Sequence, residues 1–450
     1  MNPQPACLPT RQKGTPLWFL FLEIGVVALA APFLLFPTFH SRWTAIALVA
    51  LVLVWALRWL VTGRPGVPTP LDISLLVLTL MIPVAVWASA LPEVTLPKLT
   101  GLILGLAVFR LTAAAVRTRR GLVGATAAFL LVGLGVAIFG ALGSAWPSKV
   151  WVVGLLLDAV PQWAQGLPGA KAGINVNELG GALILILPVS LAMCLVSAKN
   201  AWHSWAVRLA GLLSSLALGT LLLLTQSRSA WIGLAVGLAT MIGVRWRWAR
   251  ILLGGAIAAL VLILWRMGPA TVMQSLFQVV SDSEIGVLVG TVSLEGRMEI
   301  WNRALYAIQD FPFTGTGLGT FRQVVWVLYP LFLISPDFDI GHAHNVFLQV
   351  ALDLGLPGLI ASLALVGTAG WLCWRAARSA GNPARWLAFG VLGSLVAFHT
   401  YGMTDAIALG AKPGVIFWLL MALAVALGTI GQGAEADSQK AVESAEVESG

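Results

Sequence analysis

The sequence predicts an all-α polytopic membrane protein with about twelve transmembrane helices. Of its 450 residues, 58% are hydrophobic and only 10% are charged, and the mean hydropathy is +0.89. Soluble globular proteins carry about 25% charged residues, so a soluble fold is excluded. A helix needs about 20 apolar residues to cross the hydrocarbon core of a bilayer, and the chain supplies such runs along almost its whole length.

These runs follow one another with short connections, and their ends are defined to a few residues. The twelve predicted spans lie near residues 17–36, 44–62, 72–90, 98–116, 121–143, 178–197, 208–225, 229–244, 250–266, 345–374, 386–403 and 413–430. The run at 345–374 is long and contains the stretch GLPG. Because proline and glycine interrupt helices, we expect this helix to be tilted, bent or broken there.

The spans divide the chain into five parts. A cytoplasmic tail (1–16) precedes an N-terminal bundle of about nine spans (17–266). The largest loop of the protein (267–344) separates this bundle from about three C-terminal spans (345–430). The last residues (431–450) are rich in Glu, Ala and Ser, which predicts a disordered cytoplasmic tail.

Basic clusters predict the orientation of the spans, because short cytoplasmic loops carry an excess of Lys and Arg. Arg11 and Lys13 precede the first span, and alternate loops carry RTRR (117–120), RWRWAR (245–250) and RAAR (375–378). A twelve-span count places every cluster in the cytoplasm, so both termini are predicted to be cytoplasmic and the largest loop periplasmic. Topology and contact with anionic lipids also explain the net charge of +8 without a nucleic-acid partner.

The cysteines give no sign of a disulfide framework or a cofactor. Cys7, Cys194 and Cys373 lie in the cytoplasmic tail or near cytoplasmic span ends, where disulfides are rare. No Cys/His cluster has the spacing of a zinc site. The cysteines therefore indicate neither a disulfide framework nor a zinc site.

The largest loop is predicted to contain a short amphipathic helix over the outer mouth of the bundle. Met298, Trp301, Leu305 and Ile308 fall on one helical face. Glu299 and Arg303 stand four residues apart, the favourable order for a surface ion pair on a helix. Pro312 and the glycines that follow it are expected to end this helix.

Arg228 and Arg297 each stand at the start of a predicted helix on the outer face. Backbone N–H groups at a helix start favour anions, and Arg can bind phosphate through two parallel hydrogen bonds. The two arginines therefore indicate a ligand that carries a phosphate or a diphosphate. The alternatives are an interfacial arginine that reaches the lipid headgroups for Arg228, and an exposed loop arginine for Arg297.

His342 and His344 lie where the largest loop re-enters the membrane. A histidine of near-neutral pKa can accept a proton from a hydroxyl nucleophile. The alternatives are a structural role and metal binding, although no third ligand is obvious in the local sequence. Glu178, at the outer start of a span, could orient an arginine or the acceptor, or it could only favour the helix dipole.

Two further features near this face carry weaker signals. Asp353 lies two turns into a span, where an acid usually has a polar partner or faces a cavity. The stretch GTGLGT (315–320) lacks the preceding strand that a dinucleotide-binding loop requires. It is predicted to form a turn above the site.

Four stretches follow one another in order: NVNELGGALILILPV (175–189), SRSAWIGLAVGL (227–238), GRMEIWNRALYAIQDFPFTGTGLGTF (296–321) and HAHNVFLQVALDLGLPGLIA (342–361). Together they resemble the successive signatures of the O-antigen ligase/polymerase superfamily. The resemblance implies a GT-C-type membrane glycosyltransferase that needs no metal ion or nucleotide sugar. Such enzymes take a glycan from undecaprenyl diphosphate on the periplasmic side of the bacterial inner membrane, by an inverting single displacement.

The resemblance also assigns roles to residues. The arginine of SRSAW is Arg228 and the arginine that opens the loop helix is Arg297, and both would bind the diphosphate. The family histidine precedes an asparagine and, further on, the pattern G-x-x-G. It is His344, which would be the catalytic base.

The secondary candidates are His342, Asn345, Glu178 and Asn177. Ligases tend to carry a small hydroxyl residue or Tyr after the second glycine, where this chain has Leu359. The acceptor is therefore left open between lipid A–core oligosaccharide, as in ligases, and another lipid-linked repeat unit, as in polymerases.

The alternative from another class is a transporter of lipid-linked oligosaccharides. A flippase would be expected to line its central cavity with charge in several spans. The predicted spans are nearly free of charged residues apart from Arg110, Glu23 and Asp353. This distribution favours an enzyme with its polar residues at the outer face.

Overall fold

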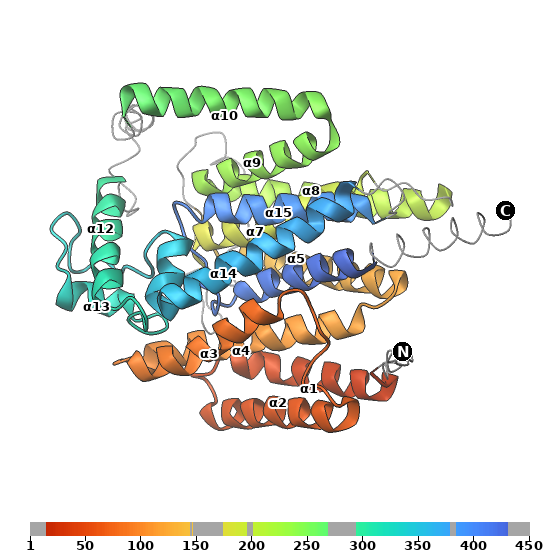
Figure 1. Ribbon diagram of the computed structural model, residues 1–450, viewed down its shortest axis with the longest axis horizontal. Helices are drawn as coiled ribbons and strands as arrows, with labels where there is room; N and C mark the ends of the chain where they lie inside the picture. The colour runs from red at the N-terminus through yellow and green to blue at the C-terminus, as the bar shows by residue number, and fades with distance from the viewer. Residues whose placement is uncertain are drawn as a thin grey trace, which may run out of the picture.

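The computed structural model describes residues 15–144, 146, 174–195, 201–268, 294–378 and 384–430, and its elements are helices (Figure 1). The helices are α1 (Leu17–Leu35), α2 (Ser41–Thr62), α3 (Asp72–Ala88), α4 (Pro92–Ala115), α5 (Arg119–Gly143), α7 (Val176–Met193), α8 (Ala201–Thr225), α9 (Arg228–Arg245), α10 (Arg247–Met267), α12 (Leu294–Asp310), α13 (Phe321–Leu328), α14 (Val346–Arg378), α15 (Arg385–Tyr401) and a last helix, Gly414–Ile430. A helix occupies each of the twelve predicted apolar runs. The predicted all-α fold is confirmed.

Eight of the described helices are long and apolar enough to cross a membrane by length and composition: α1, α2, α4, α5, α7, α8, α10 and α14. Helix α3 and the last helix are shorter and also apolar. Helix α9 carries an arginine at each end and α15 has 17 residues. The chain is a polytopic membrane protein, as predicted, and the full number of about twelve crossings stays a prediction.

Helices α7, α14, α15 and the last helix together contribute most of the main buried core. Helix α7 is apolar on all sides, as expected of a helix that is surrounded by protein. Helix α10 instead lies at the edge of the bundle, where only 7% of its apolar stretch is buried (Figure 1). Two glycines bring α9 against α15: a Cβ atom on Gly233 or Gly237 would lie 2.5 Å from a carbonyl oxygen of α15. This small-residue contact fixes the position of Arg228, the first residue of α9.

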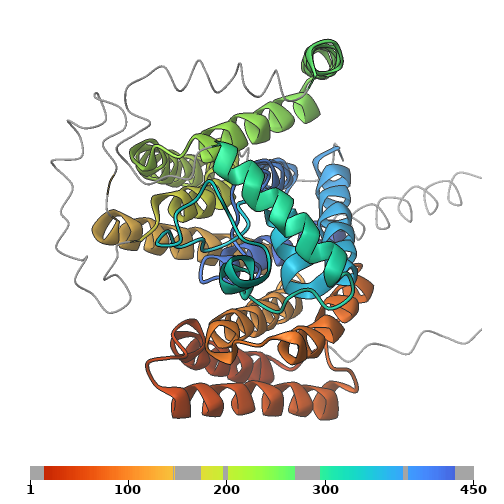
Figure 2. The same cartoon turned by 90° about the vertical axis from the view of Figure 1, so that its left-hand side faces the viewer.

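Helices α12 and α13 cover one end of the bundle, which is called the capped end below. Helix α12 runs roughly at right angles to the bundle helices in Figure 1, and Figure 2 views the capped end directly. The two helices share a small apolar core that includes Ile300, Ala304, Phe321 and Val325. The predicted loop helix is confirmed, since α12 ends at Asp310, just before Pro312.

The buried face of α12 differs from the predicted face. Met298 and Leu305 are 51% and 50% exposed, and the other two members of the predicted stripe are half-buried. The fully buried positions are Ile300, Ala304 and Ala307. Alanine side chains let α12 lie close to its neighbours, and this contact outweighs the burial of the larger apolar residues beside them.

Helix α14 is broken at the predicted place. Gly355 has a left-handed φ of 69° inside the helix, two residues before Pro357. The break leaves backbone groups of α14 free to bond to the GTGLGT turn and to Pro312, which precedes it. Leu356 N donates to Pro312 O at 2.7 Å, and Thr316 N donates to Leu352 O at 2.7 Å. The turn therefore sits on the break and joins α12 to α14.

Asp353 has the polar partners that an acid in a span requires. Its Oδ1 accepts hydrogen bonds from Gly319 N and from Gln349 Nε2, each at 2.8 Å. The predicted role of GTGLGT as a turn agrees with these contacts. Asp353 thus holds the turn to α14.

Arg58 is a further charged residue inside a predicted span, beyond those expected from the sequence. It forms a bidentate ion pair with Glu23 of α1, and each side chain is 5% exposed. Arg110 likewise pairs with Asp72, with a distance of 2.7 Å between Arg110 NH1 and Asp72 Oδ1. These arginines have protein partners, so their presence in apolar helices needs no ligand.

Some predictions fall outside the described residues. They concern Cys7, the tails 1–14 and 431–450, and most of the two outer segments before α7 and α12. The other two cysteines, Cys194 and Cys373, are free thiols, as expected.

Replacement of Gly355 by alanine is expected to destabilise the protein by about 2 kcal/mol or more. With φ 69° and ψ 177°, Gly355 lies in a backbone region almost restricted to glycine, where another residue costs about 1–3 kcal/mol, and the new Cβ atom would lie 2.2 Å from Phe313 O. The control is Gly367→Ala in the same helix, where nothing lies within 4 Å of the added atom and alanine is the better helix former. Thermal unfolding followed by tryptophan fluorescence measures both variants, and equal melting temperatures would contradict the account of the break.

Candidate functional site

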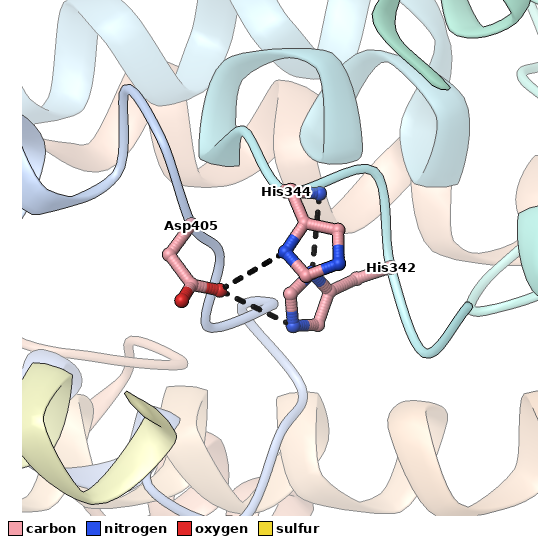
Figure 3. A group of neighbouring side chains, drawn as sticks. All are labelled: His342, His344 and Asp405. Atoms are coloured by element: carbon pink, nitrogen blue, oxygen red, sulfur yellow. Dashed lines mark hydrogen bonds and ion pairs between the residues drawn. The ribbon is translucent and has the colours of Figure 1, made fainter. Parts of the chain in front are cut away.

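Three side chains meet at the capped end: His342 and His344 from the segment before α14, and Asp405 from the loop after α15 (Figure 3). Asp405 Oδ1 lies 3.4 Å from His342 Nε2 and 3.6 Å from His344 Nδ1. The imidazole rings pack edge to face with centroids 4.5 Å apart. Asp405 is buried, whereas each imidazole keeps a small exposed part. We call these three residues the His–Asp cluster.

The polar atoms beside each ring indicate which ring nitrogens carry protons. His342 Nδ1 accepts from the backbone N–H of His344 at 3.1 Å, so a neutral His342 carries its proton on Nε2, facing Asp405. His344 presents Nδ1 to the same carboxylate, and its Nε2 points away from Asp405 (Figure 3). The carboxylate favours the tautomer with the proton on Nδ1. This leaves the lone pair of His344 Nε2 free to accept a proton.

Burial and neighbouring charges set the protonation of the cluster. Burial lowers the pKa of His342 to about 4, and the charges of Lys98 and Arg297 act in the same direction against the attraction of Asp405. Burial opposes ionisation of Asp405, but its interactions with His344, His342 and Arg297 outweigh this and lower its pKa. At neutral pH the cluster therefore contains a carboxylate beside a neutral His342.

The backbone around His344 is held in an unusual conformation. His344 has a φ of 48°, in the left-handed region that costs a residue with a Cβ atom about 1–2 kcal/mol. Its carbonyl accepts a hydrogen bond from Trp301 Nε1 of α12 at 3.3 Å. Asn345 caps α14 through its Oδ1 and donates from Nδ2 to Met403 O at 3.0 Å. Asn345 thus positions His344 beside the loop that carries Asp405.

Arg297 belongs to the same site. It lies in the first turn of α12, its Nε is buried without a hydrogen-bond partner, and its charge acts on both His342 and Asp405. Arg303 of the same helix differs, because it pairs with Glu299 at 3.9 Å, as predicted, and donates from Nε to Pro330 O at 3.0 Å. Among the residues described here, Arg297 is therefore a cation with unused hydrogen-bonding capacity.

Arg228 is exposed and has no hydrogen bond or ion pair with the described part of the chain. Its neighbour Ser229 accepts a hydrogen bond from Thr404 Oγ1 at 2.8 Å. Since Thr404 precedes Asp405, this bond ties the start of α9 to the His–Asp cluster. The fold thus brings the arginine segment of α9 to the same end of the bundle as His344.

The remaining secondary candidates lie at the start of α7. Asn177 accepts a hydrogen bond from Tyr401 OH through its backbone carbonyl at 3.0 Å, so this contact does not use its side chain. Glu178 is in the first turn of α7 and interacts electrostatically with Asp405. Both residues therefore adjoin the loop that carries Asp405.

Asp405 is the site residue that sequence reasoning missed. The predicted topology contained a usable signal, because it places the loop between spans 386–403 and 413–430 on the same outer face as His344. Asp405 also supplies the third potential metal ligand that the local sequence lacks: the ligand atoms of Asp405, His342 and His344 lie within 4.8 Å of one another.

Comparison with protein families supports the sequence resemblance. Residues 212–363 match the family model described as O-antigen ligase. This match covers less than half of the chain and agrees with the resemblance to the O-antigen ligase/polymerase superfamily. It supports a ligase- or polymerase-like function in surface polysaccharide biosynthesis. The comparison with curated proteins found no match.

The segment that matches the O-antigen ligase model contains Arg228, Arg297 and His344. Asp405 and Glu178 lie outside it, on helices and loops that pack against it. The site described above is therefore larger than the matched segment.

The stability of the protein is expected to fall as the pH is lowered from 6.5 to 5. The pKa of His342 is about 4 in the folded chain against 6.5 as its ordinary value, so the unfolded state binds more protons in this range. The expected loss at pH 5 is about 2 kcal/mol. Thermal unfolding at several pH values measures it.

His342→Gln is the matched variant, because it has no group that titrates in this range. Its unfolding temperature should depend less on pH than that of the wild type. Asp405 contributes only at lower pH, since its pKa lies below 3.8. Parallel pH curves for the two proteins would show that His342 is not buried in its neutral form.

Proposed function

We propose that the protein is a glycosyltransferase that moves a glycan from undecaprenyl diphosphate to an acceptor sugar. The observation that supports this best is the contact of His344 Nδ1 with Asp405, which leaves Nε2 free. The charge of Arg297 also acts on Asp405, and its buried Nε has no hydrogen-bond partner in the part of the chain that the structure describes. Arg228 lies at the same end of the bundle. The combination suits a reaction that removes a proton from a hydroxyl and expels an anion.

In the proposed reaction, His344 Nε2 takes the proton of an acceptor hydroxyl. The hydroxyl oxygen bonds to the anomeric carbon of the donor while the bond from that carbon to the diphosphate breaks. Undecaprenyl diphosphate leaves as an anion, and Arg228 and Arg297 stabilise the charge that develops on it. Asp405 stabilises the imidazolium form of His344. The displacement is single and inverts the anomeric centre, and no metal ion takes part.

The proposed location is the bacterial inner membrane, with both termini in the cytoplasm and the capped end in the periplasm. The acceptor is lipid A–core oligosaccharide if the enzyme is a ligase, or another lipid-linked repeat unit if it is a polymerase. Charges within the described spans support an enzyme over a transporter of lipid-linked oligosaccharides. Arg58 is paired with Glu23, and Asp353 is hydrogen-bonded, so these groups do not offer charge to a translocation path.

Transfer by purified protein tests this function. Wild type should transfer glycan from undecaprenyl diphosphate to lipid A–core or to a second donor molecule, and the productive acceptor identifies the reaction. His344→Ala and Asp405→Asn should each lower kcat by about 10²–10⁴-fold, because the base or its orientation is lost. Arg228→Ala and Arg297→Ala should lower kcat by about 10²–10³-fold.

The control is Arg322→Ala, which removes an exposed arginine that pairs with Asp339 and should leave kcat unchanged. Full transfer by His344→Ala would remove the proposed base. Loss of transfer after treatment with EDTA, with recovery on addition of a divalent metal, would replace the metal-independent mechanism by one that uses the His–Asp cluster as ligands. Movement of lipid-linked glycan across sealed vesicles without transfer would support the transporter instead.

Arg297→Lys is expected to lower kcat by about 10-fold or more although the charge is kept. A lysine ammonium cannot form the two parallel bonds of a guanidinium, and the buried Nε of Arg297 has no protein partner to lose. Arg303→Lys on the same helix is the matched control and should leave kcat close to the wild-type value. Equal rates for both variants would indicate that Arg297 acts only through its charge.

A further inference from the structure

Lys98 is a third cation close to the His–Asp cluster. It lies in the second turn of α4 and is half-buried. Its side-chain stem passes over the GTGLGT turn, so that a Cβ atom on Gly319 would lie 3.0 Å from Lys98 Cγ. Its carbonyl oxygen packs against the loop after α15, where a Cβ atom on Gly410 would lie 1.9 Å away. One contact of its side chain and one of its backbone therefore fix Lys98 between the turn and the loop that carries Asp405.

The ammonium group of Lys98 has no hydrogen bond or ion pair with the residues that the structure describes. It is nevertheless near charged groups on several elements, since it interacts electrostatically with Glu178 of α7 and with His342. Lys412, in the same loop as Asp405, also interacts with Glu178, and its Nζ lies 4.2 Å from the ring centroid of Phe36. We call Lys98, Lys412 and Glu178 the lysine cluster.

Lys98 and Arg228 belong to helices that lie on different sides of the central helices α7 and α15. Helix α9, which begins with Arg228, lies on one side of α7 and α15, and α4, which carries Lys98, lies on the other side in both views (Figures 1 and 2). In a single displacement the nucleophile approaches the anomeric carbon opposite to the leaving group. If the diphosphate binds beside Arg228 and Arg297, the acceptor sugar approaches from the side of Lys98.

The chemistry of the lysine cluster suits an acidic sugar. An ammonium group with free hydrogen-bonding capacity binds a phosphate or a carboxylate through charge-assisted bonds. The carboxylate of Glu178, which has no hydrogen bond or ion pair among the described residues, can accept bonds from sugar hydroxyls. Two lysines with one acid leave an excess of positive charge, and a neutral glycan would offer no negative charge to pair with it.

We propose that Lys98, with Lys412 and Glu178, binds an anionic substituent of the acceptor glycan, either a phosphate or a carboxylate near the accepting hydroxyl. The inference rests on the proposed function and deepens it by naming acidic glycans as the acceptor class. Lys98 is then a residue that determines acceptor specificity. It takes no part in the proton transfer itself.

Binding of a phosphorylated acceptor tests this directly. The probe is lipid A–core, compared with the same molecule after its phosphates are removed with hydrofluoric acid. Both are titrated by microscale thermophoresis into the His344→Ala protein in phosphatidylcholine nanodiscs. Lys98→Gln should weaken binding of the phosphorylated probe by about 10-fold or more, the usual effect of losing a charge-assisted bond. Binding of the dephosphorylated probe should not change.

Matched variants separate a binding role from a structural one. Lys98→Arg keeps the charge and should retain most of the affinity, and Arg322→Gln, which removes another cation at the capped end, should have no effect. Equal weakening of both probes by Lys98→Gln would overturn the proposal, because it would show that Lys98 only supports the fold near Asp353. Loss of probe binding in phosphatidylglycerol nanodiscs would assign the cation to lipid headgroups and would also overturn it.

Transfer kinetics distinguish this inference from the proposed function. In Lys98→Gln, KM should rise for a phosphorylated or glucuronate-bearing acceptor, with the KM for the lipid-linked donor unchanged. If the wild type transfers glycan and Lys98→Gln does so with the same acceptor KM, the proposed function holds and the inference fails. If the wild type transfers nothing but binds the phosphorylated probe through Lys98, the inference holds and the proposed reaction fails.

Discussion

The buried carboxylate of Asp405 is the group around which the site is arranged. An ionised acid out of contact with water is costly unless partners surround it. Asp405 Oδ1 contacts the imidazoles of His342 and His344. It also accepts a hydrogen bond from the backbone N–H of Ala406 at 2.9 Å. Arg297 adds a positive charge nearby. Because one oxygen serves both imidazoles, the orientation of each ring depends on the position of this carboxylate.

The loop that carries Asp405 is in turn fixed by the elements that carry the other candidate residues. Val346 N, at the start of α14, donates to Gly402 O at 2.7 Å, and Thr404 bonds to Ser229 at the start of α9. The glycine contact between α9 and α15 sets the distance between these segments. A displacement of either helix would therefore move Asp405 relative to His344. The geometry of the His–Asp cluster thus depends on how the apolar helices pack.

The sequence is sufficient to predict the helices and the candidate residues that lie in short linear patterns. Arg228, Arg297 and His344 are of this kind, because their neighbours along the chain mark a helix start or a re-entry into the membrane. Asp405 is different: its neighbours form an apolar loop, and only the fold brings it beside His344. The buried face of α12 was predicted wrongly for a related reason, since the choice of Ala304 over Leu305 depends on the shape of the surface that α12 meets.

The cations proposed to bind the donor and the cation proposed to bind the acceptor belong to different parts of the chain. Arg297 projects from α12, whose own apolar core and whose Trp301 contact with the His344 carbonyl tie it to the capped end. Lys98 instead projects from α4, a helix of the bundle outside the segment that matches the family model. The groups proposed to act on the leaving diphosphate thus belong to the matched segment, whereas the group proposed to choose the acceptor belongs to the rest of the chain. Under the two proposals, changes in α4 are expected to alter the acceptor, while His344, Asp405 and the arginines carry out the transfer itself.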